Sequence, residues 1–155
     1  MNQEIERKFL VDKTLWDKLE KPKGKKIIQA YLLTDPGKII RARVKAAKGY
    51  ITIKGKQEGI TRLEFEYEIP VGEAEKIISQ FGENTIDKIR YEIQIEQHIW
   101  EVDVFSGENE GLVVAEIELK SEEECFTKPE WVLKDVSKEA KYFNSNLSIK
   151  PFKSW

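Results

Sequence analysis

The chain has 155 residues, which is enough for one domain with a sizeable core, and we expect a single domain over residues 1–155. Its 26 basic and 28 acidic residues give a formal net charge of −2, so nothing indicates a general nucleic-acid or membrane-surface binder. Charged residues nevertheless make up 35% of the chain. That share exceeds the usual quarter or so, and a compact domain must place these charges somewhere.

The cysteine and histidine counts limit the metal and redox chemistry. The single cysteine, Cys125, excludes an internal disulfide and any Cys-x-x-Cys motif. The single histidine, His98, excludes zinc sites that need two or three imidazoles. Any metal should therefore be a hard cation held by oxygen atoms. The charged N-terminus and the lack of a long apolar run argue against a signal peptide and a membrane-spanning helix, so we expect a cytoplasmic protein with no membrane partner.

Most of the chain alternates between polar and apolar residues with a period of two, which is typical of β-strands. In chain order we predict strands at Gln3–Val11 and, after a helix at Asp12–Leu19, at Lys26–Thr34, Lys38–Ala46, Gly49–Lys56 and Arg62–Pro70. A helix at Gly72–Phe81 then precedes strands at Ile86–Glu96, Ile99–Phe105 and Leu112–Lys120, and a helix at Ser137–Leu147 ends the series. Short turns separate the strands, so the pattern predicts a mostly β (α+β) fold with antiparallel strands and a few flanking helices.

The charges of each predicted strand gather on one face. Residues two apart share a face, so Glu4, Glu6 and Lys8 lie together, opposite Ile5 and Phe9. The same separation recurs in the later strands, whose charged sets are Arg41, Arg43 and Lys45; Arg62, Glu64, Glu66 and Glu68; Lys88, Arg90 and Glu92; Glu101 and Asp103; and Glu116, Glu118 and Lys120.

Two interpretations of this charged face remain open. Any one strand, taken alone, is most simply the half-solvated strand of an open sheet. Taken together, about eight antiparallel strands can instead close into a barrel that holds one small ligand. If the charged face points inward, the interior cannot be a dry core, because buried charges must be paired, hydrated or bound to an ion.

An interior with charges of both signs suits a polyanion and its divalent metal. Lysine and arginine neutralise phosphate oxygens, while clustered carboxylates hold Mg²⁺ or Mn²⁺. The chain has no Gly-x-x-x-x-Gly-Lys-Ser/Thr loop, so side chains would have to bind the phosphates. Phosphoryl transfer is the chemistry that this pattern favours.

A series of motifs in a fixed order resembles the CYTH superfamily, also called the triphosphate tunnel metalloenzymes. The N-terminal run Glu4-Ile5-Glu6-Arg7-Lys8 has that family's Glu-x-Glu-x-Lys signature. The later motifs are Arg41-Ala42-Arg43, Lys54, Arg62-Leu63-Glu64-Phe65-Glu66, Lys88-Ile89-Arg90, Glu101-Val102-Asp103 and Glu116-Ile117-Glu118. The resemblance covers essentially the whole chain and is greatest to short bacterial members that act as inorganic tripolyphosphatases.

The resemblance implies a closed eight-stranded antiparallel tunnel and a role for each charged position. The positions that match triphosphate-binding cations are Lys8, Arg41, Arg43, Lys54, Arg62, Lys88 and Arg90. For the metal, Mg²⁺ or Mn²⁺, we expect Glu4, Glu6, Asp103, Glu116 and Glu118, with the two Glu-x-Glu pairs nearest to it. The expected catalytic residues, which orient water or move its proton, are Lys8, Glu64, Glu66 and Asp103.

Near the C-terminus the family often has an Arg-Tyr-x-x-Asn-type helix that plugs the tunnel and points its arginine at the substrate. Here the stretch reads Ala140-Lys141-Tyr142-Phe143-Asn144. Lys141 keeps the charge of the arginine but lacks its planar fork, and we expect it to contact the substrate.

The expected function is divalent-metal-dependent hydrolysis of a triphosphate, with inorganic tripolyphosphate as the favoured substrate. The same residues leave open a class IV-type adenylate cyclase, a thiamine triphosphatase and a nucleoside triphosphatase, because the motifs contact only phosphates. A noncatalytic module that binds polyphosphate or nucleotides would need the cations alone, whereas turnover also needs the carboxylates, all of which are present. The sequence leaves a homodimer open.

Overall fold

The computed structural model describes residues 2–155, in which β-strands are the main secondary structure. The strands are β1 (Gln3–Val11), β2 (Lys25–Asp35), β3 (Lys38–Lys45), β4 (Lys48–Gly55), β5 (Thr61–Ile69), β6 (Thr85–Ile95), β7 (His98–Phe105), β8 (Val113–Glu118) and β9 (Val132–Asp135). The helices are α1 (Lys13–Lys18), α2 (Val71–Phe81) and α3 (Asn144–Leu147), with 3₁₀ turns η1 (Gly107–Asn109), η2 (Ala140–Tyr142) and η3 (Phe152–Ser154). No helix in this range is long and apolar enough to cross a membrane.

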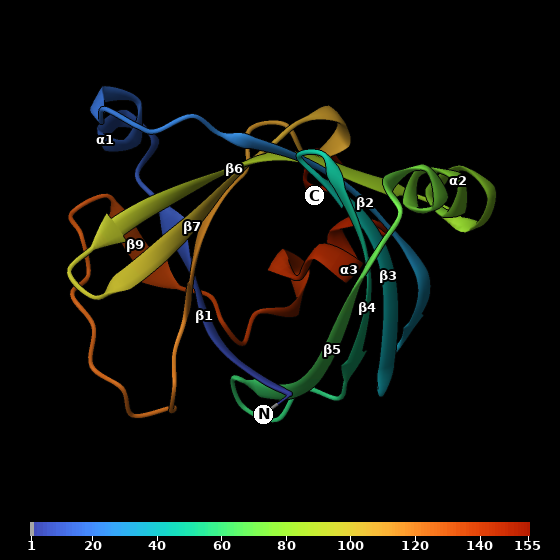
Figure 1. Cartoon of the computed structure of the whole chain (residues 1–155). Coiled ribbons are helices and arrows are strands. Elements are labelled where there is room, and N and C mark those ends of the chain that lie inside the picture. Colours follow the sequence, from blue (N-terminus) through green and yellow to red (C-terminus); the bar gives the residue numbers. More distant parts are fainter. Residues whose placement is uncertain (1) are drawn as a thin grey trace.

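Eight of the strands close into an antiparallel barrel in the order β5-β4-β3-β2-β6-β7-β8-β1, with β1 pairing back to β5 (Figure 1). The closing strand β1 serves two neighbours. Its first residues, Gln3–Ile5, pair with β5, and Glu6–Leu10 pair with β8. The predicted closed eight-stranded barrel is confirmed.

Strand β9 was not predicted. It pairs with the C-terminal half of β1, where Phe9 lies opposite Asp135 and Val11 opposite Val132. The strand has only four residues and buries only Val132, so the sequence carries no alternation that could reveal it.

The main hydrophobic core lies outside the barrel wall. Because the charged side chains of β1, β7 and β8 point inward, their apolar partners point outward and form one cluster with Trp16 of α1 and Trp131 of the loop before β9. Trp100 is fully buried there, with ring centroids 5.4 Å from Phe9 and 6.1 Å from Trp131. Helix α1, strand β9 and the loop between β8 and β9 therefore serve as a cover for the barrel.

Helix α2 covers a second outer face, over β2, β3 and β4 (Figure 1). Ala74 and Ile78 are its buried residues, and Ile78 packs against Ala30 and Ala42 of the barrel. The approach is close: a side chain at Gly82, directly after the helix, would come within 2.4 Å of Ala30 Cβ. Glycine at this position lets the helix end against the sheet.

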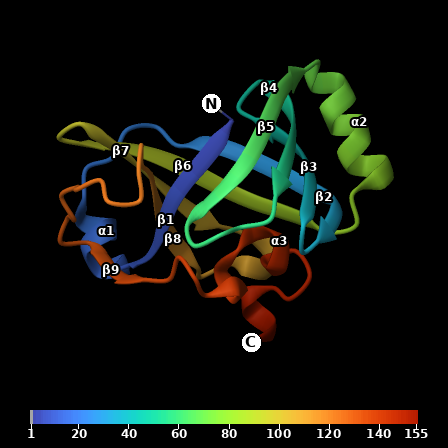
Figure 2. The ribbon, with the colours of Figure 1, turned by 90° about the horizontal axis from the view of Figure 1, so that it is seen from below.

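The C-terminal segment closes one end of the barrel, whereas the N-terminus lies at the other end (Figure 2). Tyr142 and Leu147 are buried there in an apolar cluster with Tyr31 and Ile86. The predicted C-terminal plug is present, but it is not one helix over Ser137–Leu147. The extended backbone of Phe143, with φ −69° and ψ 134°, separates η2 from the four-residue α3.

This inside-out arrangement predicts effects of very different size for two neighbouring residues of β8. Ile117 is fully buried on the outer face, so Ile117→Ala should lower the free energy of unfolding by about 2–5 kcal/mol. Glu118 points into the barrel and is exposed, so Glu118→Gln should change it by less than about 0.5 kcal/mol. Urea unfolding of both variants measures the difference. Equal losses of unfolding free energy would contradict the location of the main core outside the barrel.

Candidate active site in the barrel

The barrel encloses a cavity of about 190 Å³ lined mainly by charged side chains. This is below the roughly 300–1,000 Å³ of pockets for drug-sized ligands, so it suits a small ligand. Every predicted site residue except Asp103 and Lys141 lines it, namely Glu4, Glu6, Lys8, Arg41, Arg43, Lys54, Arg62, Glu64, Glu66, Lys88, Arg90, Glu116 and Glu118. The C-terminal segment adds Ser137, Phe143, Asn144 and Ser145 to the lining.

The wall formed by β3 has an excess of positive charge. Within residues 2–155, Arg43 forms no ion pair, and its Nε donates a hydrogen bond to Gln29 Oε1 at 2.9 Å. Burial, together with repulsion from Arg41 and Arg90, lowers the pKa of Arg43 to about 10. Arg41 pairs with Glu66 at 3.3 Å, while its buried Nε has no hydrogen-bond partner in the described chain. Both arginines thus have donors available to an anion in the cavity.

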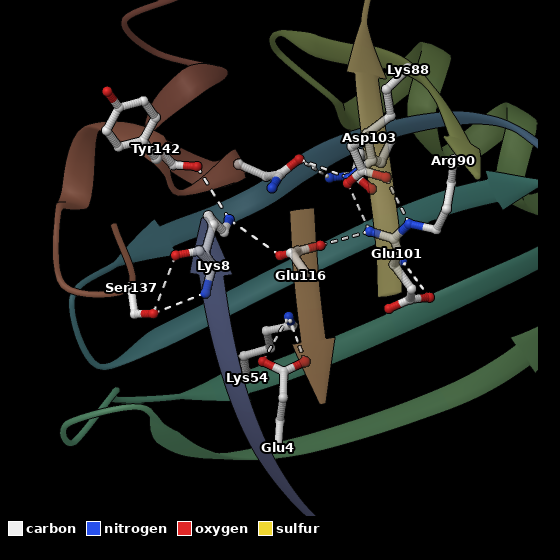
Figure 3. A network of polar contacts seen from close by, with 12 residues as sticks. Glu4, Lys8, Lys54, Lys88, Arg90, Glu101, Asp103, Glu116, Ser137 and Tyr142 are labelled. Atoms are coloured by element: carbon white, nitrogen blue, oxygen red, sulfur yellow. Dashed lines mark hydrogen bonds and ion pairs between the residues drawn. The ribbon is translucent and has the colours of Figure 1, made fainter. Parts of the chain in front are cut away.

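A chain of ion pairs runs along the inside of the barrel from β6 through β7 and β8 to β1 (Figure 3). We call this part of the wall the barrel floor. Lys88 Nζ donates to Asp103 at 2.7 Å, and Arg90 binds the same carboxylate through two contacts of 2.8 Å. Arg90 also contacts Glu116 at 2.9 Å, and Glu116 pairs with Lys8 at 3.3 Å. Lys8 Nζ in turn donates to the carbonyl oxygen of Tyr142 at 3.2 Å, which ties the chain to the C-terminal segment.

Burial and charge act in opposite directions in this chain of ion pairs. Burial alone would raise the pKa of Asp103, but Arg90 and Lys88 hold it below its ordinary value. Lys8 and Arg90 likewise hold the pKa of the buried Glu116 well below the usual range. For Lys88, burial and the nearby Arg90 and Arg43 outweigh Asp103 and lower the pKa to about 7.

The opposite wall, formed by β1 and β8, crowds carboxylates together. Burial and repulsion from Glu116 and Glu4 raise the pKa of Glu6 well above its ordinary value. Burial, with Glu4 and Glu101 nearby, also raises the pKa of Glu118. Within residues 2–155, neither Glu6 nor Glu118 has a basic nitrogen within 4.0 Å, which is the reach of an ion pair. The crowded negative charge on this wall is therefore not fully compensated.

Glu4 of β1 and Glu64 of the neighbouring strand β5 have contrasting pKa values. Lys54 and Arg62, at 3.2 and 3.3 Å, overcome the effect of burial and lower the pKa of Glu4 to about 2. Burial and a hydrogen bond with Glu4 raise the pKa of the neighbouring Glu64 to about 7. Glu64 also pairs with Lys54 at 3.2 Å.

The donor chemistry of the β1–β8 wall fits a hard divalent cation. In the described residues, no three His, Cys, Asp or Glu side chains are already grouped closely enough to hold a metal ion. The raised pKa values of Glu6 and Glu118 nevertheless reflect burial and the repulsion of nearby carboxylates such as Glu4, both of which a bound cation would offset. All the donors are oxygen atoms, which Mg²⁺ and Mn²⁺ prefer.

Two predicted site residues lie away from the cavity surface. Asp103 is completely buried beneath Lys88 and Arg90, where it orients both cations. Lys141 is exposed, with its Nζ 4.5 Å from the ring centroid of Trp155 and 5.3 Å from that of Tyr142. The structure therefore does not bring Lys141 together with the other predicted substrate-binding cations, because it stacks on these two rings.

Several polar residues of the cavity region were not predicted. Gln29 and Tyr31 of β2 and Thr52 of β4 occupy inward positions, which the strand alternation could have revealed. Thr52 donates to Glu66 at 2.8 Å and accepts from Arg41 at 3.0 Å. Asn144 comes from the C-terminal segment, and the plug motif was the one sequence signal that could have indicated its place in the cavity.

The fold and the cavity define a closed barrel whose interior is lined by charges of both signs, and comparison with known proteins identifies its family. The model of the CYTH domain matches residues 2–148. An inorganic triphosphatase from Acetivibrio thermocellus is 48% identical over 100% of this chain and 99% of its own length. An inorganic triphosphatase from Nitrosomonas europaea is 30% identical over 94% of this chain and 97% of its own length. A crystal structure of an inorganic triphosphatase has a TM-score of 0.64 and 28% identity over 94% of both chains. The chain belongs to the CYTH domain family.

The ion-pair chain predicts a large cost for removing its central anion. Asp103→Asn leaves Lys88 and Arg90 buried with reduced compensation, so the free energy of unfolding should fall by about 3–5 kcal/mol. The exposed pair of Arg7 and Asp135 provides the control, because Asp135→Asn should cost no more than about 1 kcal/mol. Chemical denaturation of both variants tests this, and similar costs would show that Asp103 is not the electrostatic centre.

Proposed function

We propose that the protein hydrolyses inorganic tripolyphosphate inside the barrel, with Mg²⁺ or Mn²⁺ as cofactor. The observation that carries this proposal is the division of the cavity into a wall with surplus cationic donors and a facing wall of crowded carboxylates. A polyanion with a divalent cation complements both walls at once. The two relatives named inorganic triphosphatase, which align over nearly the whole chain, support the same reaction.

The cations of the cavity hold the triphosphate. Arg41 and Arg43 offer their free donors from β3, and Arg62 and Lys54 line the cavity on β5 and β4. Lys8, Lys88 and Arg90 extend this set from the floor. Since these seven cations and Lys45 line a cavity of about 190 Å³, the phosphate chain is fixed in position and its charge is neutralised before reaction.

Glu4, Glu6, Glu116 and Glu118 are the residues that would hold the metal, because they share the β1–β8 wall. A bound divalent cation supplies Lewis-acid stabilisation of the charge that develops on the phosphate oxygens. Asp103 is too deeply buried to share this role and instead keeps Lys88 and Arg90 directed into the cavity.

Glu64 is the residue best placed to accept the proton of the attacking water. Its side chain is partly exposed to the cavity, and its pKa of about 7 lets it gain and lose a proton near neutral pH. Glu66 has a different task, because it accepts hydrogen bonds from Arg41 and Thr52 and so orients that arginine. Lys8 is held by Glu116 and by the carbonyl oxygen of Tyr142, and it neutralises negative charge on the bound phosphates.

The cavity lining favours a compact triphosphate over a nucleotide. The aromatic residues that line it are Tyr31 and Phe143, and both belong to the end closed by the C-terminal segment. An adenosine or thiamine group would therefore have to remain outside the opposite mouth. Catalysis rather than binding alone is supported by the complete carboxylate set beside the cations.

Phosphate release from tripolyphosphate with Mg²⁺ or Mn²⁺ is the direct test of this function. We expect turnover by the unaltered protein, and Arg43→Ala should lower kcat/KM roughly 10- to 100-fold through loss of charge-assisted hydrogen bonds. Arg7→Ala is the matched control, since Arg7 pairs with Asp135 outside the barrel and should retain full activity.

Parallel assays with ATP and thiamine triphosphate separate the alternatives. Cyclic AMP with pyrophosphate would assign a cyclase, and faster release from thiamine triphosphate would change the substrate. If no substrate is turned over while tripolyphosphate still raises the melting temperature, the protein is a binding module and the proposed hydrolysis is wrong.

The metal site predicts a stability effect that does not depend on turnover. The pKa of Glu6 is higher in the folded chain than in the unfolded chain. The folded chain is therefore destabilised as the pH rises above the pKa that Glu6 has in the unfolded chain. At neutral pH, Glu6→Gln should therefore raise the melting temperature without metal and weaken the increase that Mn²⁺ produces. Glu75→Gln, on the exposed side of α2, should keep the full response to Mn²⁺. An undiminished response in Glu6→Gln would place the metal elsewhere.

A further inference from the structure

Asn144 lies where the C-terminal segment meets the cavity. It is the first residue of α3 and lines the cavity together with Phe143 and Ser145. Its side-chain oxygen Oδ1 accepts hydrogen bonds from Lys88 Nζ at 2.9 Å and from Gln29 Nε2 at 3.4 Å. A residue more than fifty positions away in sequence thus completes the environment of a buried cation of the barrel floor.

These two contacts determine which way the amide of Asn144 points. The lysine ammonium and the glutamine NH₂ group can only donate, so the asparagine oxygen must face them. The amide nitrogen Nδ2 is then turned away from both, and within residues 2–155 it has no hydrogen-bond acceptor. A donor without a partner, at the closed end of a cavity rich in cations, is suited to an oxygen of an anionic ligand.

Asn144 also limits the orientation of Lys88. The Lys88 side chain is almost fully buried, and two of its three N–H donors are used by Asp103 at 2.7 Å and by Asn144. With both acceptors in place, the third N–H is left for a ligand in the cavity that Lys88 lines. Without the asparagine oxygen, Asp103 alone would hold the ammonium, and its direction would no longer be set.

We propose that Asn144 has two roles at the closed end of the cavity: its Oδ1 positions Lys88, and its Nδ2 donates a hydrogen bond to the terminal phosphate of the bound triphosphate. This inference rests on the proposed function and assigns the substrate contact of the C-terminal segment to Asn144 in place of Lys141. The segment is then part of the active site, in addition to closing the barrel.

Steady-state kinetics on tripolyphosphate with three variants test both roles. Asn144→Ala removes the acceptor and the donor, and kcat/KM should fall roughly 10- to 100-fold, with kcat itself reduced. Asn144→Asp keeps an acceptor for Lys88 but sets a negative charge against the phosphate. Its KM should rise about tenfold or more, while its kcat stays within about threefold of the unaltered protein. Asn146→Ala is the control, because Asn146 belongs to the same short helix and its side chain donates only to the carbonyl of Ala140, at 2.7 Å.

The outcomes separate this inference from the proposed function. If the unaltered protein releases no phosphate, the proposed function fails, and the inference fails with it. If the unaltered protein is active and Asn144→Ala stays within twofold of it, the function stands and the role of Asn144 is wrong. Equal losses in Asn144→Ala and Asn146→Ala, with equal drops in melting temperature, would also overturn the inference, because they would reveal a purely structural role. Melting temperatures near that of the unaltered protein, with the kcat and KM split described above, support it.

Discussion

The pairing of opposite charges inside the barrel is the interaction on which the rest of the structure depends. A buried charge costs several kcal/mol unless a partner compensates it, and here Asp103 and Glu116 compensate Lys8, Lys88 and Arg90 in one continuous chain. Because the strands alternate, an inward charged face requires an outward apolar face. That face needs its own cover, which explains why α1, α2 and β9 surround a barrel whose interior is apolar only at the end that the C-terminal segment closes.

The compensation is incomplete in two places, and these define the site. Arg41 and Arg43 retain free donors on β3, while Glu6 and Glu118 repel their neighbours on the facing wall. A fully paired interior would have little affinity for an ion. In this interior, the β3 wall has an excess of positive charge and the β1–β8 wall an excess of negative charge. Under the proposed function, a triphosphate with a divalent cation would complete both sets at once, so stability and function would share the same residues.

Much of this could be predicted from the sequence because period-two alternation is a local signal. It indicated the barrel strands and the charged residues that share one face of each strand, including Arg41 and Glu116, whereas the choice between an open sheet and a closed barrel needed the resemblance of the motifs. Strand β9 was missed since four residues carry no alternation, and the C-terminal helix was predicted too long because Phe143 is extended to fit the closed end. Lys141 and Asn144 show the limit most clearly. They are three residues apart, yet one stacks on Trp155 outside and the other contacts Lys88 inside, a difference that only long-range packing decides.

The most direct measurement is anomalous diffraction at the manganese edge from crystals grown with Mn²⁺ and a non-hydrolysable triphosphate analogue. We expect manganese beside Glu6, Glu116 and Glu118, with the phosphates between that wall and Arg41 and Arg43. Manganese on the β3 wall, or phosphates bound outside the barrel, would contradict a site built from two oppositely charged walls.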